Sequence, residues 1–397
     1  MAVSRPSERA LVSVIGAVVL VDTMFYAVIA PLLPALAHEL HLSKLSAGVL
    51  TASYPLGTLL GALPGGVLTA RLGPRAAVVS GLTLFALSTT AFAFLHSAPA
   101  LDAARLVEGV GGACSWAGGI AWVANATDPA RRGALIGRVL AAAVAGALFG
   151  PVVGTIASAV GRPPAFAAVG VVAAILIAAS LRLDYVHTRT EQGLRELRAA
   201  LRGAGIALGM WLVALPAIAS GVITVLAPLR LHRFGAGAAA IGAIFLLAAA
   251  LEAGVSPAIG SLSDRRGRLL PLRVGLALTA SLLLCFTLPA SVALLGLLVI
   301  ALEASLGAFW SPAMAWLSDA AEGHRLDQGL AAALMNFAWA AGQVLGSAAG
   351  GALAASTGDE LPAAAAAALC IGTLMIALRA RAAVGPVEAE PSHSGRA

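Results

Sequence analysis

The loop sequence Gly66-Val67-Leu68-Thr69-Ala70-Arg71-Leu72-Gly73-Pro74-Arg75 recurs in altered form as Gly260-Ser261-Leu262-Ser263-Asp264-Arg265-Arg266-Gly267-Arg268, 194 residues further along the chain. Each copy joins two long apolar stretches and ends a predicted helix with glycine and a basic turn. Other landmarks repeat at nearly the same offset: Trp116 and Trp122 match Trp310 and Trp316, and Gly146, Gly150 and Gly154 match Gly342, Gly346 and Gly350. The repeat predicts two halves of similar structure.

The composition places these halves in a membrane. Of the 397 residues, 59% are hydrophobic and 11% are charged, and the mean hydropathy is +0.92. An average soluble domain is about 45–50% apolar and about 25% charged. A soluble chain with so few charges would leave its surface poorly hydrated, and a disordered chain would be poor in apolar residues. We therefore expect an all-α polytopic membrane protein.

A helix needs about 20 apolar residues to cross a bilayer. The sequence contains twelve such stretches, at residues 11–34, 45–70, 76–96, 99–125, 135–158, 163–182, 205–229, 237–260, 270–289, 291–317, 328–355 and 361–380. A polar segment between the sixth and the seventh divides them equally. The expected domains are an N-terminal six-helix bundle (1–182), a cytoplasmic linker with a short surface helix (183–204), a C-terminal six-helix bundle (205–383) and a disordered cytoplasmic tail (384–397).

The basic residues indicate the orientation. With twelve spans, 20 of the 25 Lys and Arg residues fall on the side of both termini, Arg105 lies within a span, and the other side has Lys44, Arg162, Arg230 and Arg233. Cytoplasmic loops carry the excess of basic residues, so both termini are expected in the cytoplasm. Lys44 is the only lysine, and the bias to Arg, Ala and Gly is typical of a GC-rich genome. We expect a multi-pass protein of a bacterial plasma (inner) membrane.

These features together resemble the major facilitator superfamily over nearly the whole chain. The two loops are similar to its signature, a glycine-rich helix end followed by Asp-Arg-x-Gly-Arg. The conformational residues so implied are Gly66, Arg71, Gly73 and Arg75 in the first copy and Gly260, Asp264, Arg265, Gly267 and Arg268 in the second. In the family, the aspartate contacts the start of a helix in the other half and steadies the outward-facing state. Ala70 replaces it in the first copy, which leaves Asp264 as the expected latch residue.

The fifth span carries Gly146, Gly150, Pro151 and Gly154. This pattern resembles the motif that distinguishes the drug–proton antiporter branch of the family. Small residues at every fourth position let two helices approach closely, and proline removes a hydrogen bond and bends its helix. We expect these residues to form a smooth, kinked contact face between the halves.

Several charged residues lie inside predicted spans, where an isolated charge is costly. Arg105 and Glu108 are three apart and share one helix face; they are similar to the family's Arg-x-x-Gln-Gly motif, with Glu in place of Gln. The resemblance implies that spans one, four, seven and ten line a central cavity, which Asp22, Arg105, Glu108 and Glu303 would face. Glu252 lies on the eighth span, nearer the flank, where a structural role is the alternative. We predict that these five residues couple transport to protons.

Aromatic and amide side chains are expected to shape the substrate cavity. The candidates are Tyr26, Trp116, Phe309, Trp310, Asn336, Phe337, Trp339 and Gln343. A lipophilic cation can be held by aromatic faces together with one carboxylate. The alternative for each aromatic residue is ordinary packing inside the bundle.

The predicted function is secondary active export of a small lipophilic or cationic compound in exchange for protons, by alternating access. Asp22, sharing its proton with Glu108 and Arg105, would bind a proton or a cation but not both, which links the two fluxes. The alternative is a proton-coupled exporter or symporter of a sugar, an amino acid or another polar metabolite.

Other functional classes lack their motifs. An ATP-driven pump needs a phosphate-binding Gly-Lys-Ser/Thr loop, whereas Lys44 follows Ser43. Nothing resembles a channel filter, and the histidines have no metal-type spacing, so we expect no enzyme, no metal site and no cofactor. The expected partners are the small-molecule substrate, protons and the lipid bilayer, without nucleic acid, and the chain is expected to be a monomer.

Overall fold

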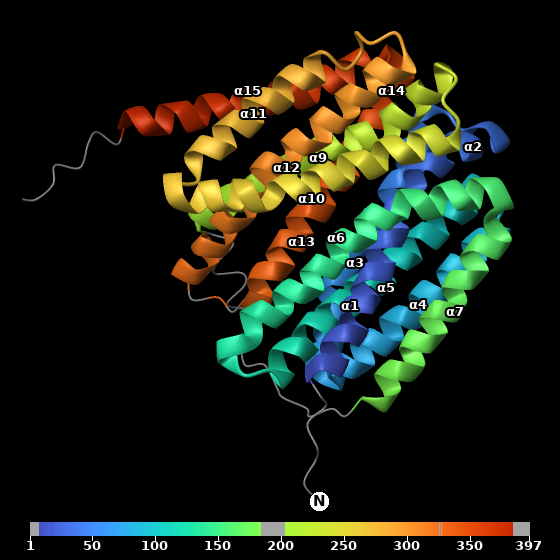
Figure 1. Ribbon diagram of the computed structural model, residues 1–397, viewed down its shortest axis with the longest axis vertical. Helices are drawn as coiled ribbons and strands as arrows, with labels where there is room; N and C mark the ends of the chain where they lie inside the picture. Colours follow the sequence, from blue (N-terminus) through green and yellow to red (C-terminus); the bar gives the residue numbers. More distant parts are fainter. Residues whose placement is uncertain (1–7, 184–202, 325, 327, 384–397) are drawn as a thin grey trace, which may run out of the picture.

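The computed structural model describes residues 8–183, 203–324, 326 and 328–383, and the helices in these ranges coincide with the twelve predicted spans (Figure 1). The first group contains α1 (Glu8–Ala27), α2 (Ile29–Glu39), α3 (Lys44–Leu72), α4 (Pro74–Phe94), α5 (Ala98–Ala126), α6 (Pro129–Val160) and α7 (Arg162–Arg182). The second contains α9 (Ala204–Arg233), α10 (Ala238–Arg266), α11 (Leu269–Leu284), α12 (Val292–Gly323), α13 (Gln328–Val344), α14 (Gly350–Thr357) and α15 (Glu360–Ala383). The predicted linker helix and tail lie outside the described residues, except for residues at the ends of the linker range.

The two groups of helices repeat the same internal packing, and they form the two halves of the molecule. In each half a glycine-rich helix lies against the first helix of that half, and its glycines touch backbone carbonyls there. The contacts are Gly146 with Leu20, Gly150 with Met24, Gly342 with Ala214 and Gly346 with Ile218. In Figure 1 the blue-to-green helices and the yellow-to-red helices accordingly form two separate bundles. The predicted two-half, all-helical fold is confirmed.

Two of the spans are not single regular helices. The first is divided at Val28 into α1 and α2. Pro31 and Pro34 have no backbone N–H, so they cannot bond the carbonyls of Ala27 and Ala30, and the helix is weakened at this point. The eleventh contains a π-helical turn at Leu345–Ala349 between α13 and α14. Such irregular backbone is tolerated within a membrane where neighbouring helices cover it.

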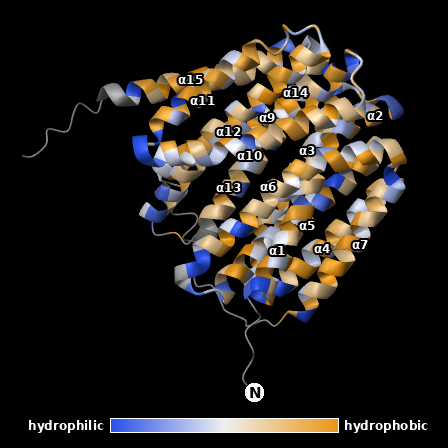
Figure 2. Ribbon diagram, viewed as in Figure 1, coloured by the Kyte–Doolittle hydropathy of each residue, from blue (hydrophilic) through white to orange (hydrophobic). Residues whose placement is uncertain are grey.

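The outer surface fits a bilayer. Eight of the described helices, among them α1, α9 and α12, are each long and apolar enough to cross a membrane. Large side chains such as Leu87, Ile175 and Ile376 are exposed on the outside of the bundle. Apolar residues fill the middle of the helices in Figure 2, and hydrophilic residues gather near their ends. Hydrocarbon, rather than water, is the environment that suits this surface.

The halves meet at one end of the bundle, which we call the Lys44 end because α3 begins there with Lys44. A Cβ atom placed on Gly48 would lie 2.5 Å from the Ser347 carbonyl oxygen and 3.0 Å from Gly351 Cα. Next to this contact, Lys44 Nζ donates to Asp359 Oδ1 across the halves at 2.6 Å. Thr155 Oγ1 on α6 donates to the Ala238 carbonyl on α10 at 3.3 Å.

Toward the opposite, arginine-rich end, which carries Arg71, Arg75 and Arg265, the halves diverge. Gly66 lies 18 residues, or five turns, beyond Gly48 on the same face of α3, yet a Cβ there would meet nothing within 4 Å. The same holds on α10, where Gly242 touches Thr155 of α6 and Gly260, again five turns further along, faces open space. Two helix pairs thus show a bundle closed at the Lys44 end and open at the arginine-rich end.

Candidate transport site

Asp22 is held by a hydrogen bond to each of its two carboxylate oxygens. Tyr54 Oη on α3 donates to Oδ1 at 2.8 Å, and Trp116 Nε1 on α5 donates to Oδ2 at 2.8 Å. The Asp22 side chain is buried, with 5% of its surface exposed. Gly112 makes room for this arrangement, because a Cβ on it would lie 2.4 Å from Asp22 Oδ1 and 2.9 Å from Tyr54 Oη.

Arg105 joins the fourth span to the break in the first. Its guanidinium donates from Nη1 to the Phe25 carbonyl at 2.9 Å and from Nη2 to the Tyr26 carbonyl at 3.3 Å, close to the end of α1. It also forms an ion pair of 3.1 Å with Glu108 one turn further along α5. Both side chains are buried. Arg105 therefore bonds two backbone carbonyls next to the helix break and at the same time neutralises a buried carboxylate.

Glu252 and Glu303 form an acidic pair in the second half. They lie on α10 and α12, near enough for their charges to interact. Glu252 packs over Gly307, one turn beyond Glu303, where a Cβ would be 2.5 Å from Glu252 Cγ. Neither carboxylate forms an ion pair with another described residue. Both residues are partly exposed, unlike Asp22, Arg105 and Glu108, which are buried.

Tyr26 connects the acidic groups of the two halves. Its ring lies 5.4 Å from the Tyr54 ring in its own half and 5.1 Å from the Trp339 ring on α13 of the other half. Its hydroxyl is close enough to Glu303 and to Arg105 to interact with both charges. Arg105 also lies over the Tyr54 ring at 5.0 Å. Aromatic side chains therefore lie between Asp22 on one side and Glu303 on the other.

A family model described as "Major Facilitator Superfamily" matches residues 15–325 and 214–396. The chain belongs to the Major Facilitator Superfamily. Membership accounts for the multi-pass architecture of twelve spans in two halves.

Curated relatives match this chain over only part of their length. It is 30% identical to "MFS-type transporter ppzB" of Metarhizium majus over 41% of this chain and 36% of that protein. It is 30% identical to "Multidrug resistance protein 1" of Bacillus subtilis over 38% of this chain and 40% of that protein. A "Probable vesicular acetylcholine transporter-B" of Danio rerio is 34% identical over 38% of this chain and 32% of its own. The matches span less than half of each relative.

Solved structures of the superfamily show the same fold over nearly the whole chain. A bacterial homologue of the human lysosomal transporter Spinster, in an inward-facing and unoccupied conformation, superposes with a TM-score of 0.78 at 13% identity, covering 96% of this chain and 100% of that one. A D-xylose–proton symporter superposes with a TM-score of 0.74 at 17% identity, covering 93% and 96% of the two chains.

The remaining predicted cavity residues are distributed unevenly. Phe309 is fully buried and lies against Gly275 of α11, so it is packed inside the second half. Gln343 is also buried, and its carbonyl lies against Gly221 of α9. Trp310 and Asn336 are partly exposed, while Phe337 is 42% exposed. Among the predicted cavity residues, Tyr26 contacts Trp339 and Trp116 hydrogen-bonds Asp22.

The two signature loops have the turn geometry that glycine permits. Gly73 and Gly267 end α3 and α10 with φ angles of 90° and 82°, a region that other residues rarely adopt. Arg75 donates to the Leu181 carbonyl in its own half, and Arg71 is exposed. Arg268 pairs with Asp264 at 3.6 Å and with Asp319 at 2.6 Å, also within one half. Gly66 lies on α3, and Gly260 and Arg265 lie on α10, just before these turns. In this conformation Asp264 is paired inside its own half.

The expectation for the glycines of the fifth span is corrected in one respect. Gly146 and Gly150 face α1, and Gly154 faces Val28 and Pro31 at the start of α2, all in the same half; their Cβ positions would lie 2.3, 2.6 and 2.4 Å from backbone carbonyls. Small residues serve the closest helix contact, and that contact is inside the half. The neighbouring face of α6, with Pro151 and Thr155, is the one that meets α10 of the second half.

Sequence reasoning missed three participants: Tyr54, Gly112 and the Lys44–Asp359 pair. Tyr54 is one aromatic residue in an apolar span, and nothing in the local pattern separates it from a packing residue. Lys44 and Asp359 are 315 positions apart, so only the folded chain brings them together. One signal was available, because Lys44 is the only lysine in the sequence.

Proposed function

We propose that this transporter exports a small lipophilic or cationic compound in exchange for protons, as a monomer in a bacterial plasma membrane. The arginine-rich end faces the cytoplasm in this proposal, since cytoplasmic loops carry the basic excess. The described conformation is then open to the cytoplasm and closed at the Lys44 end toward the outside.

The observation that carries the proposal is the set of acidic groups around one aromatic bridge. Asp22 and the Arg105–Glu108 pair lie in the first half, Glu303 and Glu252 lie in the second, and Tyr26 reaches both sets. The second half has two carboxylates without a paired cation among the described residues, so a cation or a proton would be bound there favourably. Aromatic rings beside the carboxylates favour organic cations.

The exchange follows from competition. A proton on Asp22, or on the Glu252–Glu303 pair, removes the negative charge that attracts a cationic cargo, so proton and cargo displace each other. If each ligand has a different affinity for the two conformations, the fluxes are linked. Matching relatives include a multidrug resistance protein and a "Synaptic vesicular amine transporter" of Homo sapiens, which supports a cationic or lipophilic cargo.

The test uses tetraphenylphosphonium as a model lipophilic cation in proteoliposomes with an imposed pH gradient. We expect the wild-type protein to drive tetraphenylphosphonium uptake against its gradient in exchange for protons, and Asp22→Asn to abolish this while reconstituting normally. The control Glu360→Gln changes an exposed carboxylate at the start of α15, a helix that carries none of the residues of the site. Unchanged proton-driven uptake by Asp22→Asn would refute the assignment, and uptake in the direction of proton flow would favour symport.

A further inference from the structure

We propose that Trp116 and Tyr54 are positioning residues that hold Asp22 in its ionised form and decide which of its oxygens accepts the transported proton. This inference rests on the proposed function, because it concerns the same carboxylate. It adds a separate claim about two side chains that do not themselves exchange protons.

The first step is the different chemistry of the two donors. An indole N–H only donates, so Trp116 cannot accept a hydrogen bond from a protonated Oδ2. A phenol both donates and accepts, so the Tyr54 hydroxyl can rotate and accept from a protonated Oδ1. The incoming proton must therefore bind Oδ1, with Tyr54 reversing its hydrogen bond while Trp116 keeps donating to Oδ2.

The second step is the fixed geometry around the carboxylate. Gly112 lies against Asp22 Oδ1 and Tyr54 Oη and leaves no room for the carboxylate to turn toward α5. The titratable side chains facing Asp22 are Tyr54 from α3 and Arg105 and Glu108 from α5. The face of α6 against α1 is made of glycines, and α7 contributes the ring of Phe166 against Phe25. Trp116 and Tyr54 are thus the only described side chains that hydrogen-bond the Asp22 carboxylate.

Loss of the two donors should therefore raise the proton affinity of Asp22 to different extents. Removing the Trp116 N–H takes away a donor that serves the ionised form alone, so protonation becomes easier. A hydrogen bond to a charged group is strong enough to change proton affinity by about tenfold to a hundredfold, or about one to two pH units. Removing the Tyr54 hydroxyl takes away a partner of both forms, so its effect is smaller.

The experiment is a pH titration of the purified transporter by infrared difference spectroscopy, which detects the carbonyl band of a protonated carboxyl group. Asp22→Asn identifies the Asp22 band by its loss. We expect Trp116→Phe to move the midpoint of that band upward by about one to two pH units, and Tyr54→Phe to move it less. Trp211→Phe is the matched control, because Trp211 Nε1 donates to Thr373 Oγ1 at 3.0 Å far from Asp22.

The outcomes separate this inference from the proposed function. A titrating Asp22 band with the same midpoint in wild type, Trp116→Phe and Tyr54→Phe overturns the positioning role and leaves proton coupling by Asp22 intact. Proton-driven uptake that survives Asp22→Asn overturns the proposed function instead. A shift in Trp116→Phe that is larger than in Tyr54→Phe, with none in Trp211→Phe, supports the inference.

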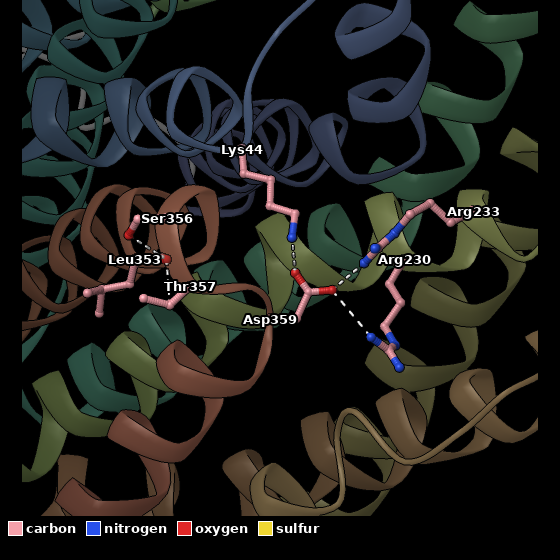
Figure 3. A network of polar contacts seen from close by, with 7 residues as sticks. All are labelled: Lys44, Arg230, Arg233, Leu353, Ser356, Thr357 and Asp359. Carbon is pink, nitrogen blue, oxygen red and sulfur yellow. Dashed lines mark hydrogen bonds and ion pairs between the residues drawn. The ribbon is translucent and has the colours of Figure 1, made fainter.

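A second, independent observation concerns the Lys44 end, and from it we infer that Lys44 and Asp359 form a releasable latch between the halves. Asp359 precedes α15 and receives hydrogen bonds from Lys44 at 2.6 Å, from Arg230 at 3.3 Å and from Arg233 (Figure 3). Both arginines belong to α9 in the same half as Asp359. Lys44, from the first half, is the one member of this cluster that crosses between the halves.

The asymmetry of the cluster makes the latch releasable. Leaving a buried carboxylate without a cation is strongly unfavourable, and the Asp359 side chain is only 4% exposed. When Lys44 departs, Arg230 and Arg233 remain bound, so Asp359 is never unpaired. The Lys44 side chain is already 26% exposed, and its ammonium group is readily hydrated at an opened Lys44 end.

The test compares Lys44→Gln with Arg233→Gln, which removes the same charge from the same carboxylate within one half. Spin labels at Ser97 and Ala355, both exposed near the Lys44 end on opposite halves, report the separation after Cys114, Cys285 and Cys370 are replaced. We expect Lys44→Gln to shift the ratio of closed to open molecules about tenfold toward the longer distance. Arg233→Gln should leave the distance distribution as in the wild type. Equal distributions in the two variants, whether changed or unchanged, would overturn the latch.

Discussion

Gly48→Ala adds one methyl group at the contact that closes the Lys44 end. Its Cβ would lie 2.5 Å from the Ser347 carbonyl oxygen and 3.0 Å from Gly351 Cα, whereas ordinary contacts of a Cβ begin at 3.4 Å. Both partners are backbone atoms of the π turn and α14, so no flexible side chain can move aside. The two halves must separate by about 0.9 Å at this point, or the helices must distort.

The magnitude follows from the cost of overpacking. An added methyl group in a tightly packed contact costs about 1–3 kcal/mol. The cost applies only to molecules closed at the Lys44 end, because opening that end removes the contact. A difference of about 1.4 kcal/mol changes a two-state ratio tenfold, so the ratio should shift by about 5- to 140-fold toward molecules open at the Lys44 end.

The assay is the separation of spin labels at Ser97 and Ala355 in the cysteine-free background. The matched control is Gly372→Ala on α15, where a Cβ would meet nothing within 4 Å. We expect Gly48→Ala to increase the population at the longer distance and Gly372→Ala to match the parent protein. If Gly48→Ala keeps the parent distribution and the parent thermal stability, the halves do not meet at this glycine and the reasoning is refuted.

Three further predictions concern the charged groups. Gly112→Ala should displace the Asp22 carboxylate, because its Cβ would lie 2.4 Å from Oδ1. Proton-driven tetraphenylphosphonium uptake should then fall as in Asp22→Asn, while the protein remains folded. Normal uptake would contradict the site geometry. Arg105→Gln should lower the free energy of unfolding by about 3–5 kcal/mol, since it leaves buried Glu108 unpaired. The double variant with Glu108→Gln should recover part of this loss in thermal unfolding. An equally unstable double variant would show that the bonds of Arg105 to the Phe25 and Tyr26 carbonyls matter more. Burial alone would raise the pKa of Asp359, but the hydrogen bond and charge of Lys44 together with Arg233 outweigh it and hold that pKa below its ordinary value of 3.8. A carboxylate with a lowered pKa contributes stability at pH values above its ordinary pKa, and that stability is lost only as the pH falls below it. The Ser97–Ala355 distance should therefore be constant from pH 8 to pH 5. Opening within that range would show that another group controls the latch.

The spans were predictable because the bilayer imposes a simple rule on the sequence. Every stretch such as 205–229 or 291–317 must be apolar along about 20 residues to cross hydrocarbon, and the described helices follow the predicted ranges. The repeat was visible because glycines at a four-residue spacing mark the contact of α6 with α1 and of α13 with α9. The same glycines did not indicate their partner, and the sequence reasoning placed them between the halves although they lie within each half.

Part of the candidate site was also predictable. A charged residue inside a membrane span is energetically costly and is therefore expected to have a function. This identified Asp22, Arg105, Glu108 and Glu303 from the sequence. The carboxylate partners were not predictable, because Tyr54, Trp116 and Gly112 come from two other helices and resemble many packing residues. The break at Val28 was equally hidden, since proline in a membrane helix is often accommodated without a break.

The sequence by itself determined that the chain crosses a membrane twelve times in two related halves and that acidic groups lie within the spans, because hydropathy and internal repetition are local properties of the chain. The tertiary structure decided which residues bind Asp22, which glycines close the Lys44 end and that Lys44 meets Asp359. These contacts join positions up to 315 residues apart. Their geometry depends on how the helices cross, and side-chain packing sets that crossing only when the whole bundle is assembled.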